Sequence, residues 1–409
     1  MRKVLIVGAG QAGLQLALGL QAQQYEVTLI SGRTPEQIRG GRVMSTQAMF
    51  GTALANERAR GLNFWDGEAP QITGLRKTVE KPGEGRLLDW RGEFSRPAQS
   101  VDQRVKMARW LELFAERGGD VQYRNVTASE LDGLTPGYEL VVVATGAGEL
   151  GRIFERDPQH SPFTSPQRAL AVAYVRGAAA SPDVPDDGLL RANSIAGIGD
   201  IYVIPGCTFG GACDVLLYEG IPDGPMDCWS DRPGADEQWA RMLELMRDHL
   251  PSEHARFTGA ELTDERATLA GGVTPVVRKP VAELPSGAAV LGMGDAVVAN
   301  DPITGQGANV ANRCAESYLD SIVARGEQPF DRSWMQQSFD RFWQHAQHVV
   351  TWTNTSLRPA QPHVQRIMAA AAEHPEIRNR FADGFDDPAD FQTWFLDPAG
   401  ADAYLRSFG

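Results

Sequence analysis

The sequence predicts an α/β protein: a parallel sheet flanked by helices, an inserted and mostly antiparallel second sheet, and a helical C-terminus. Three observations carry this prediction. The chain opens on a strand, a glycine turn, a helix and a second strand. Residues 140–144 form a continuous apolar run, as in a parallel strand buried on both faces. Proline-rich, alternating segments between residues 163 and 271 give way to helical spacing after residue 330.

The N-terminal segment has the clearest pattern. Residues 4–7 are expected to form an apolar strand, residues 8–13 a tight turn, residues 14–23 a helix and residues 26–30 a second strand. Gly40-Gly41 then breaks the chain.

The next elements alternate between the two expected sheets. Small and apolar side chains predict a helix over residues 44–57. Residues 65–95 are polar and turn-rich with alternating patches, which is typical of an antiparallel sheet. Helical spacing returns over residues 101–117, and short strands follow at 121–123 and 140–144.

The second half of the chain first continues the inserted sheet. Strands such as residues 201–204 are expected there, together with a helix at 239–249. A strand at 289–293 leads back to the first sheet, a helix covers 305–325, and the rest from residue 330 reads as helical.

Composition excludes several classes of function. With 409 residues, of which 42% are hydrophobic, the chain can bury a large core. Its 39 Lys and Arg against 52 Asp and Glu give a net charge of −13, which argues against binding to nucleic acids or anionic membranes. Four cysteines without a CxxC pair predict neither a disulfide scaffold nor a metal site, and a cytoplasmic location is expected. No apolar run is long enough to span a membrane.

A complete GxGxxG motif, Gly8-Ala9-Gly10-Gln11-Ala12-Gly13, lies between the first strand and the first helix. Gly8 permits the tight turn, Gly10 lets backbone amides approach a pyrophosphate, and Gly13 lets the helix pack on the sheet. The motif predicts a dinucleotide site, the alternative being a purely structural turn. The second strand ends without the usual ribose-binding carboxylate, so Ser31 or Arg33 is expected to contact the adenosine part; a solvated loop cation is the alternative for Arg33.

A second pattern follows the strand at 289–293. Gly294-Asp295 ends that strand, and a Pro/Gly loop then opens a helix. Asp295 can accept a ribityl hydroxyl, and free amides at the helix start can hold the pyrimidine edge of a flavin. Together the two motifs resemble the FAD domain of para-hydroxybenzoate-hydroxylase-like monooxygenases. The cofactor-binding residues expected here are Gly294, Asp295, Pro302, Gly305, Gln306, Gly307, Ala308 and Asn309, with Arg42 added by the family resemblance below.

That resemblance implies a Rossmann-like FAD-binding domain made of residues 1–65, 97–160 and 271–330. Residues 66–96 and 161–270 would form a mostly antiparallel β substrate-binding domain, and residues 331–409 a C-terminal helical region.

A missing motif narrows the class of enzyme. Single-component members of the superfamily carry a middle Asp-Gly motif that serves both FAD and the nicotinamide cofactor. The matching stretch here, VVVATGAG (residues 141–148), has no Asp-Gly. The chain is therefore expected not to bind NAD(P)H and to receive reduced FAD from another protein.

Further strings resemble the two-component styrene and indole monooxygenases over nearly the whole chain. They are GRVMSTQAM (41–49), PAQSVDQR (97–104), SPF and PQRA (161–163 and 166–169), the loop 301–309, and TWTN (351–354).

The resemblance points to the indole branch of this family. Styrene-epoxidising members carry Asn, Val and His where this chain has Ser45, Gln47 and Met49, and Ala98 also matches the indole branch. Ile72 is assigned to the same substrate wall, and Pro302 and Thr304 to the reacting face of the flavin. The alternative is an ordinary helix under the flavin. Three alternate residues share one side only if the segment begins in extended conformation.

The implied activity is epoxidation of indole to indole 2,3-epoxide, which leads to indoxyl and indigo, with styrene-like vinyl arenes also accepted. The family's C4a-hydroperoxyflavin chemistry needs no catalytic side chain and no metal. The implied partners are O₂ and a transiently bound NADH-dependent flavin reductase, and a homodimer is compatible with the sequence. The alternatives are a styrene monooxygenase proper, a flavin-dependent halogenase, a single-component aromatic hydroxylase and a non-catalytic FAD-fold binding protein.

Overall fold

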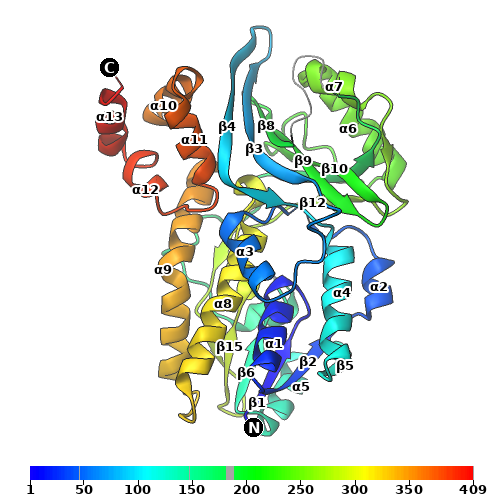
Figure 1. The fold of residues 1–409 in the computed structure, drawn as a ribbon, viewed down its shortest axis with the longest axis vertical. Helices are drawn as coiled ribbons and strands as arrows, with labels where there is room; N and C mark the ends of the chain where they lie inside the picture. The colour runs from blue at the N-terminus through cyan, green and yellow to red at the C-terminus, as the bar shows by residue number, and fades with distance from the viewer. Residues whose placement is uncertain (46, 147, 181–187, 409) are drawn as a thin grey trace.

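Two sheets placed one above the other along the length of the molecule organise the fold (Figure 1). The computed structural model describes residues 1–45, 47–146, 148–180 and 188–408. Thr46 and Ala147, each part of a sequence motif above, lie outside the described residues. The expected α/β class is confirmed.

The lower sheet is the expected parallel one. Its strand order is β14-β15-β6-β1-β2-β5, and only the edge strand β14 runs antiparallel to its neighbour. The central strands are continuous apolar runs, which is what burial on both faces requires. Its strands are β1 (Lys3–Val7), β2 (Glu26–Ser31), β5 (Asp120–Tyr123), β6 (Leu140–Val143), β14 (Val281–Glu283) and β15 (Ala289–Gly292).

The upper sheet has eight strands in the order β11-β7-β10-β9-β8-β3-β4, with β12 paired to β7. All its pairs are antiparallel except β3 with β8. Its strands are β3 (Gln71–Lys81), β4 (Gly85–Gln99), β7 (Ala169–Arg176), β8 (Leu189–Ile195), β9 (Gly199–Thr208), β10 (Gly211–Gly220), β11 (Glu261–Leu262) and β12 (Thr268–Gly271). A separate short pair joins β13 (Val276–Val277) to β16 (Val298–Ala299).

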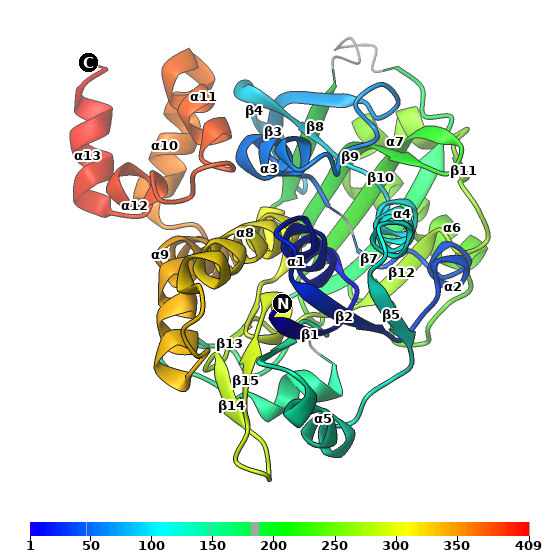
Figure 2. The same cartoon turned by 60° about the horizontal axis from the view of Figure 1, so that its bottom comes forward.

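Helices cover both sheets. In the lower half α1 (Gln11–Ala22) packs on α8 (Gly307–Arg325), and α8 packs on the long α9 (Arg332–Ser356) (Figure 2). On the other side of the lower half lie α2 (Pro35–Arg39), α4 (Gln103–Glu116) and α5 (Ala128–Leu134).

Other helices cover the two faces of the upper sheet. On one face α6 (Ala235–His249) and α7 (Pro251–Phe257) bury an apolar cluster that includes Trp239 and Tyr218. The C-terminal helices α10 (Pro362–Glu373), α11 (Pro375–Asp383), α12 (Phe391–Trp394) and α13 (Pro398–Arg406) lie beside β4 at the upper left of Figure 1.

The expected helix over residues 44–57 is shorter than the helical pattern indicated, and the described residues before Gly51 agree with the extended start that positions 45, 47 and 49 implied. Helix α3 (Gly51–Ala59) begins only at Gly51, and Met49 pairs with Gln99 of β4 as an isolated antiparallel bridge. The side chain of Asn309 explains the extended start: it accepts from the backbone N–H of Phe50 (2.9 Å) and donates to the carbonyl of Ala48 (2.8 Å). A side chain thus satisfies backbone groups that a helix would otherwise pair.

Smaller differences concern helix starts. Three helices begin at Gln11, Ala235 and Gly307, whereas the sequence predicted starts at residues 14, 239 and 305. The short helix α2 was not predicted. Positions near a helix start depend on the local caps more than on periodicity, which sets only the interior.

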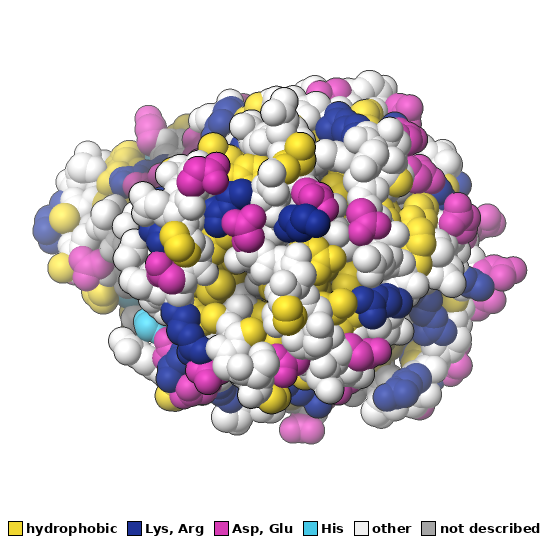
Figure 3. All heavy atoms as spheres, turned by 90° about the horizontal axis from the view of Figure 1, so that it is seen from below, with side chains coloured by type: hydrophobic (Ala, Val, Ile, Leu, Met, Phe, Trp, Pro, Cys, Tyr) yellow, Lys and Arg dark blue, Asp and Glu magenta, His cyan; other side chains and the backbone are white. Residues whose placement is uncertain are grey.

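Charge is mixed on the face seen from below. Figure 3 shows acidic and basic side chains interspersed there, with no broad area of one sign. Within the described ranges, no helix combines the length and the apolar character needed to cross a membrane.

Candidate functional site

The glycines of the turn between β1 and α1 let other groups lie close to the backbone. Gly8 has φ +120°, and a Cβ there would lie 2.3 Å from the carbonyl oxygen of Ala144 on the neighbouring β6 side. A Cβ on Gly13 would lie 2.0 Å from the carbonyl oxygen of Gly8. A Cβ on Gly10 would meet no atom within 4 Å, and α1 has no side-chain N-cap. The turn therefore leaves open space in front of free helix amides, as a pyrophosphate requires.

The side chain of Gln11 forms hydrogen bonds inside the protein. Its amide donates to Gln15 and to the buried Glu57, each at 3.0 Å, and Glu57 forms an ion pair with the buried Lys106 (2.7 Å). This network ties the start of α1 to α3 and α4. The amide nitrogen of the Gln11 side chain is thus engaged inside the protein, and its backbone remains available to a cofactor.

The second glycine motif lies next to the first. Gly294 has φ +57°, and a Cβ there would lie 3.1 Å from the Cβ of Ala12. The neighbouring Asp295 follows this turn directly, and its side chain is exposed to solvent. An exposed carboxylate beside this turn fits the role of accepting ribityl hydroxyls.

Helix α8 begins directly after the Pro/Gly loop without a side-chain cap. Its N-cap residue Gln306 instead donates to the carbonyl oxygen of Phe385 (2.8 Å). The first amides of α8 therefore stay free, as a flavin ring edge requires. The two uncapped helices, the open space at Gly10 and the exposed carboxylate of Asp295 fit an FAD.

Of the residues expected near the adenosine part of the cofactor, Ser31 is buried, whereas Arg33 and Arg42 are exposed. The hydroxyl of Ser31 is buried and donates to the backbone carbonyl of Arg33 (2.6 Å), so it closes a local turn. The guanidinium of Arg33 contacts the sulfur of Met44 (3.4 Å). Arg42 is exposed.

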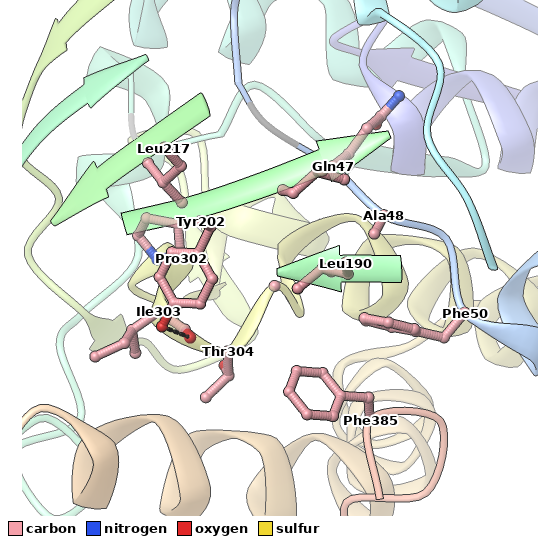
Figure 4. A pocket seen from close by; sticks show the side chains of 12 residues that line it. Gln47, Ala48, Phe50, Leu190, Tyr202, Leu217, Pro302, Ile303, Thr304 and Phe385 are labelled. Atoms are coloured by element: carbon pink, nitrogen blue, oxygen red, sulfur yellow. Dashed lines mark hydrogen bonds between the residues drawn. The ribbon is translucent and has the colours of Figure 1, made fainter. Parts of the chain in front are cut away.

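A pocket lies where the upper sheet meets the Pro/Gly loop (Figure 4). The cavity itself has a volume of about 30 Å³, and the whole gap between its walls, part of it open to solvent, is about 380 Å³. The phenol of Tyr202 points to the loop and donates to the carbonyl oxygen of Ile303 (3.0 Å). The lining residues are Gln47, Ala48, Phe50, Leu190, Tyr202, Ile204, Leu217, Pro302, Ile303, Thr304, Gly305 and Phe385.

Three of the expected substrate residues line this pocket. Pro302 and Thr304 border it from the loop, and the Thr304 hydroxyl is hydrogen-bonded to that of Thr353 (2.7 Å). Gln47 borders it too, but its amide nitrogen points away from the cavity and donates to the carbonyl of Val101 (Figure 4). The side-chain amide of Gln47 therefore binds the backbone of Val101 and does not face the cavity.

The other expected substrate residues lie behind or beside the pocket wall. The hydroxyl of Ser45 accepts from Gln103 (2.8 Å), which also donates to the Gln47 side chain. Met49 packs in a small apolar cluster at the start of α3. Ile72 and Ala98 pair with each other across β3 and β4 and are fully buried in the cluster that backs Phe50.

The sequence indicated the sheet around residues 201–204 only as the alternative substrate wall, and most of the remaining pocket wall was not predicted as substrate-contacting. Tyr202 and Ile204 alternate on β9, so strand periodicity marks them as sharing a face. Ala48 and Phe50 fall between the residues that the family resemblance selected. Phe385 lies in the turn after α11, far in sequence from the other wall residues, and no local sequence pattern predicts that it lines the pocket.

The described residues contain no group of three or more His, Cys, Asp or Glu side chains placed to hold a metal ion.

Comparisons with known proteins fit this geometry. A family model described as "Styrene monooxygenase A putative substrate binding domain" matches residues 146–256, and a pyridine nucleotide-disulphide oxidoreductase model matches residues 2–155. Styrene monooxygenases StyA from Pseudomonas fluorescens and a Pseudomonas species are each 30% identical over 399 residues, covering 95% of this chain and 93% of theirs.

Solved structures share the fold at low identity. The flavin-dependent brominase Bmp2 has a TM-score of 0.67 and 15% identity, covering 99% of this chain and 98% of its own. PqsL of P. aeruginosa in complex with 2-aminobenzoylacetate has a TM-score of 0.64 and 16% identity, covering 94% and 99%. The para-hydroxybenzoate-hydroxylase-like fold and the cofactor FAD are thus confirmed.

We expect Gly10→Val to weaken FAD binding without unfolding the protein, because the new side chain enters open space that the pyrophosphate requires. Titration of the apoprotein with FAD, followed by flavin fluorescence, measures this. Gly133→Val, the same change at an exposed glycine with equally open surroundings, is the control and should leave the affinity unchanged.

Asp295→Ala should weaken FAD binding by about 1–3 kcal/mol, because a charged hydrogen bond is lost. Wild-type titration curves for both site variants would remove the motifs from the cofactor site.

Proposed function

The chain belongs to the styrene monooxygenase StyA family and is a flavin-dependent monooxygenase; we propose that it epoxidises indole to indole 2,3-epoxide, which leads to indoxyl and indigo. Vinyl arenes such as styrene are proposed as further substrates. The proposal selects the indole branch because Ser45, Gln47, Met49 and Ala98 match it.

The observation that carries the proposal is the apolar pocket beside the Pro/Gly loop. Its walls are Phe50, Leu190, Ile204, Leu217 and Phe385, and its polar groups are few. A flat bicyclic arene buries its faces favourably against such walls. Polar contacts then only orient it, and the Tyr202 phenol and the Thr304 hydroxyl are the nearest candidates.

Reduced FAD, when bound, supplies the chemistry by activating O₂ and delivering one oxygen atom to a C=C bond. The residues of this chain bind, orient and exclude water. The glycine turn and Asp295 would hold the cofactor, while Pro302 and Thr304 would border both the reacting face of the flavin and the pocket. The apolar wall keeps water from the reacting atoms, which favours oxygen transfer over loss as H₂O₂.

We propose that reduced FAD comes from an NADH-dependent flavin reductase that binds transiently. The stretch 141–148 has no Asp-Gly motif for a nicotinamide cofactor, as noted above. A cytoplasmic location and a homodimer complete the proposal.

A halogenase function has less support. Flavin-dependent halogenases share the fold at 15–16% identity, but the Trp-x-Trp-x-Ile-Pro signature expected of them is absent from this sequence. Trp229, the nearest match, is buried with the α6 cluster on the opposite face of the upper sheet from the pocket.

We expect the purified chain to oxidise indole when photoreduced FAD and O₂ are supplied without a reductase. Epoxide-derived product, measured by chromatography or as indigo, is the readout. The chain alone should not oxidise NADH or NADPH at a useful rate, even with FAD and indole present. Rapid indole-stimulated NAD(P)H consumption would make it a single-component enzyme, and reoxidation of FAD without any organic product would contradict the epoxidase.

We expect the triple variant Ser45→Asn, Gln47→Val, Met49→His to lower the ratio of indole to styrene turnover about tenfold or more. Changes in a pocket wall typically shift selectivity by about 1–3 kcal/mol. FAD affinity should stay unchanged, because none of the three belongs to the glycine motifs.

Ile204→Phe is the companion variant, since it narrows the pocket from the β9 side. If Ile204→Phe moves the ratio and the triple variant does not, the substrate is selected by the upper sheet, and residues 45, 47 and 49 are scaffold.

A further inference from the structure

Two carboxyl groups are buried next to each other behind the pocket. Glu219 near the end of β10 and Asp301 before the Pro/Gly loop are both fully inaccessible to solvent. Their side chains interact directly. Among the described residues, no N–H or O–H group donates to either oxygen of Glu219 or to Oδ2 of Asp301.

The surroundings do not supply a charge that would keep both groups ionised. Asp200 lies opposite Glu219 on β9 and adds a third negative charge, while Arg168 is the cation that acts on the pair. Lys77 donates to Ser194, which in turn donates to Asp200, so this lysine serves the third carboxylate. Tyr202 is a further titratable neighbour of the pair.

Burial therefore favours a neutral form. It raises the pKa of Glu219 well above its usual range and that of Asp301 to about 6. Two adjacent carboxylates in a dry site cannot both carry a charge at low cost. A proton on Glu219 provides the donor that the geometry lacks, because a protonated carboxyl donates to its neighbour.

Each of the two carboxyl groups lies next to a residue that lines the pocket. The other oxygen of Asp301 accepts from the backbone N–H of Ile303 (3.1 Å) and so caps the turn that carries Pro302. Glu219 stands two residues after Leu217, which lines the pocket from the same face of β10.

We propose that Glu219 is a positioning residue, whose protonated carboxyl donates a hydrogen bond to Asp301 so that the pair, holding one proton, fixes the loop Pro302–Gly305 beside the pocket. The effect on indole rests on the proposed function, whereas the shared proton does not.

The infrared spectrum tests the proton directly. At pH 7 the wild type should show the C=O stretching band of a protonated carboxylic acid that Glu219→Gln lacks. Asp200→Asn, on the adjacent strand, is the matched control and should keep the band. A wild-type spectrum without this band would mean that Glu219 is ionised and satisfied by water, which would overturn the proposal.

Stability against pH gives a second readout. A native-state pKa raised above its unfolded value makes stability fall as pH rises above about 4.3, the usual value for Glu. Glu219→Gln keeps the donor but cannot ionise, so the melting temperature of the wild type should fall relative to this variant as pH rises above about 4.3. Parallel profiles would contradict the shared proton.

Kinetics test the positioning role. Glu219→Gln should keep a wild-type KM for indole at pH 7, because it still donates, and Glu219→Leu should raise KM severalfold with a smaller change in kcat. Equal KM values in all three proteins would overturn the positioning role. Failure of the wild type to oxidise indole would instead defeat the proposed function and leave the infrared result standing.

Discussion

The hydrogen bonds that hold residues 301–309 are the constraint on which the candidate site depends. This segment leaves the parallel sheet and enters α8 with few regular backbone partners, so its polar groups need partners from elsewhere. Three of the partners, Tyr202, Phe385 and Ala48, line the pocket, and the fourth, Thr353, lies in α9. The bonds run from Tyr202 to Ile303, between Thr304 and Thr353, from Gln306 to Phe385, and from Asn309 to Ala48.

This arrangement brings the two halves of the site together. The glycine motifs touch through Gly294 and Ala12, and both leave free helix amides at the same edge of the parallel sheet. The upper sheet supplies an apolar wall within reach of the loop that follows the second motif. In a flavin-dependent monooxygenase the cofactor carries the difficult chemistry, so the contribution of the protein is to fix this geometry.

Periodicity and glycine spacing predicted the parallel sheet, the inserted antiparallel sheet and the C-terminal helices, because these patterns follow from burial. The helical pattern over residues 44–57 failed in the described residues before Gly51, where a side chain from α8 pairs with backbone groups of Ala48 and Phe50; the alternate positions 45, 47 and 49 had implied an extended start there. Tertiary contacts of this kind leave no local signal. The same holds for Phe385 and for the Glu219–Asp301 pair, which only the folded chain brings to the loop. Family resemblance named Gln47, Pro302 and Thr304, but it missed the β9 wall.

A crystal structure of the protein with FAD and indole tests the central claim most directly, namely that the pocket beside residues 302–305 holds the arene being oxidised. The account predicts indole in contact with Ile204, Leu217 and Pro302, with its C2–C3 bond toward the flavin ring. Indole bound elsewhere, or a flavin ring that fills this pocket itself, would contradict it.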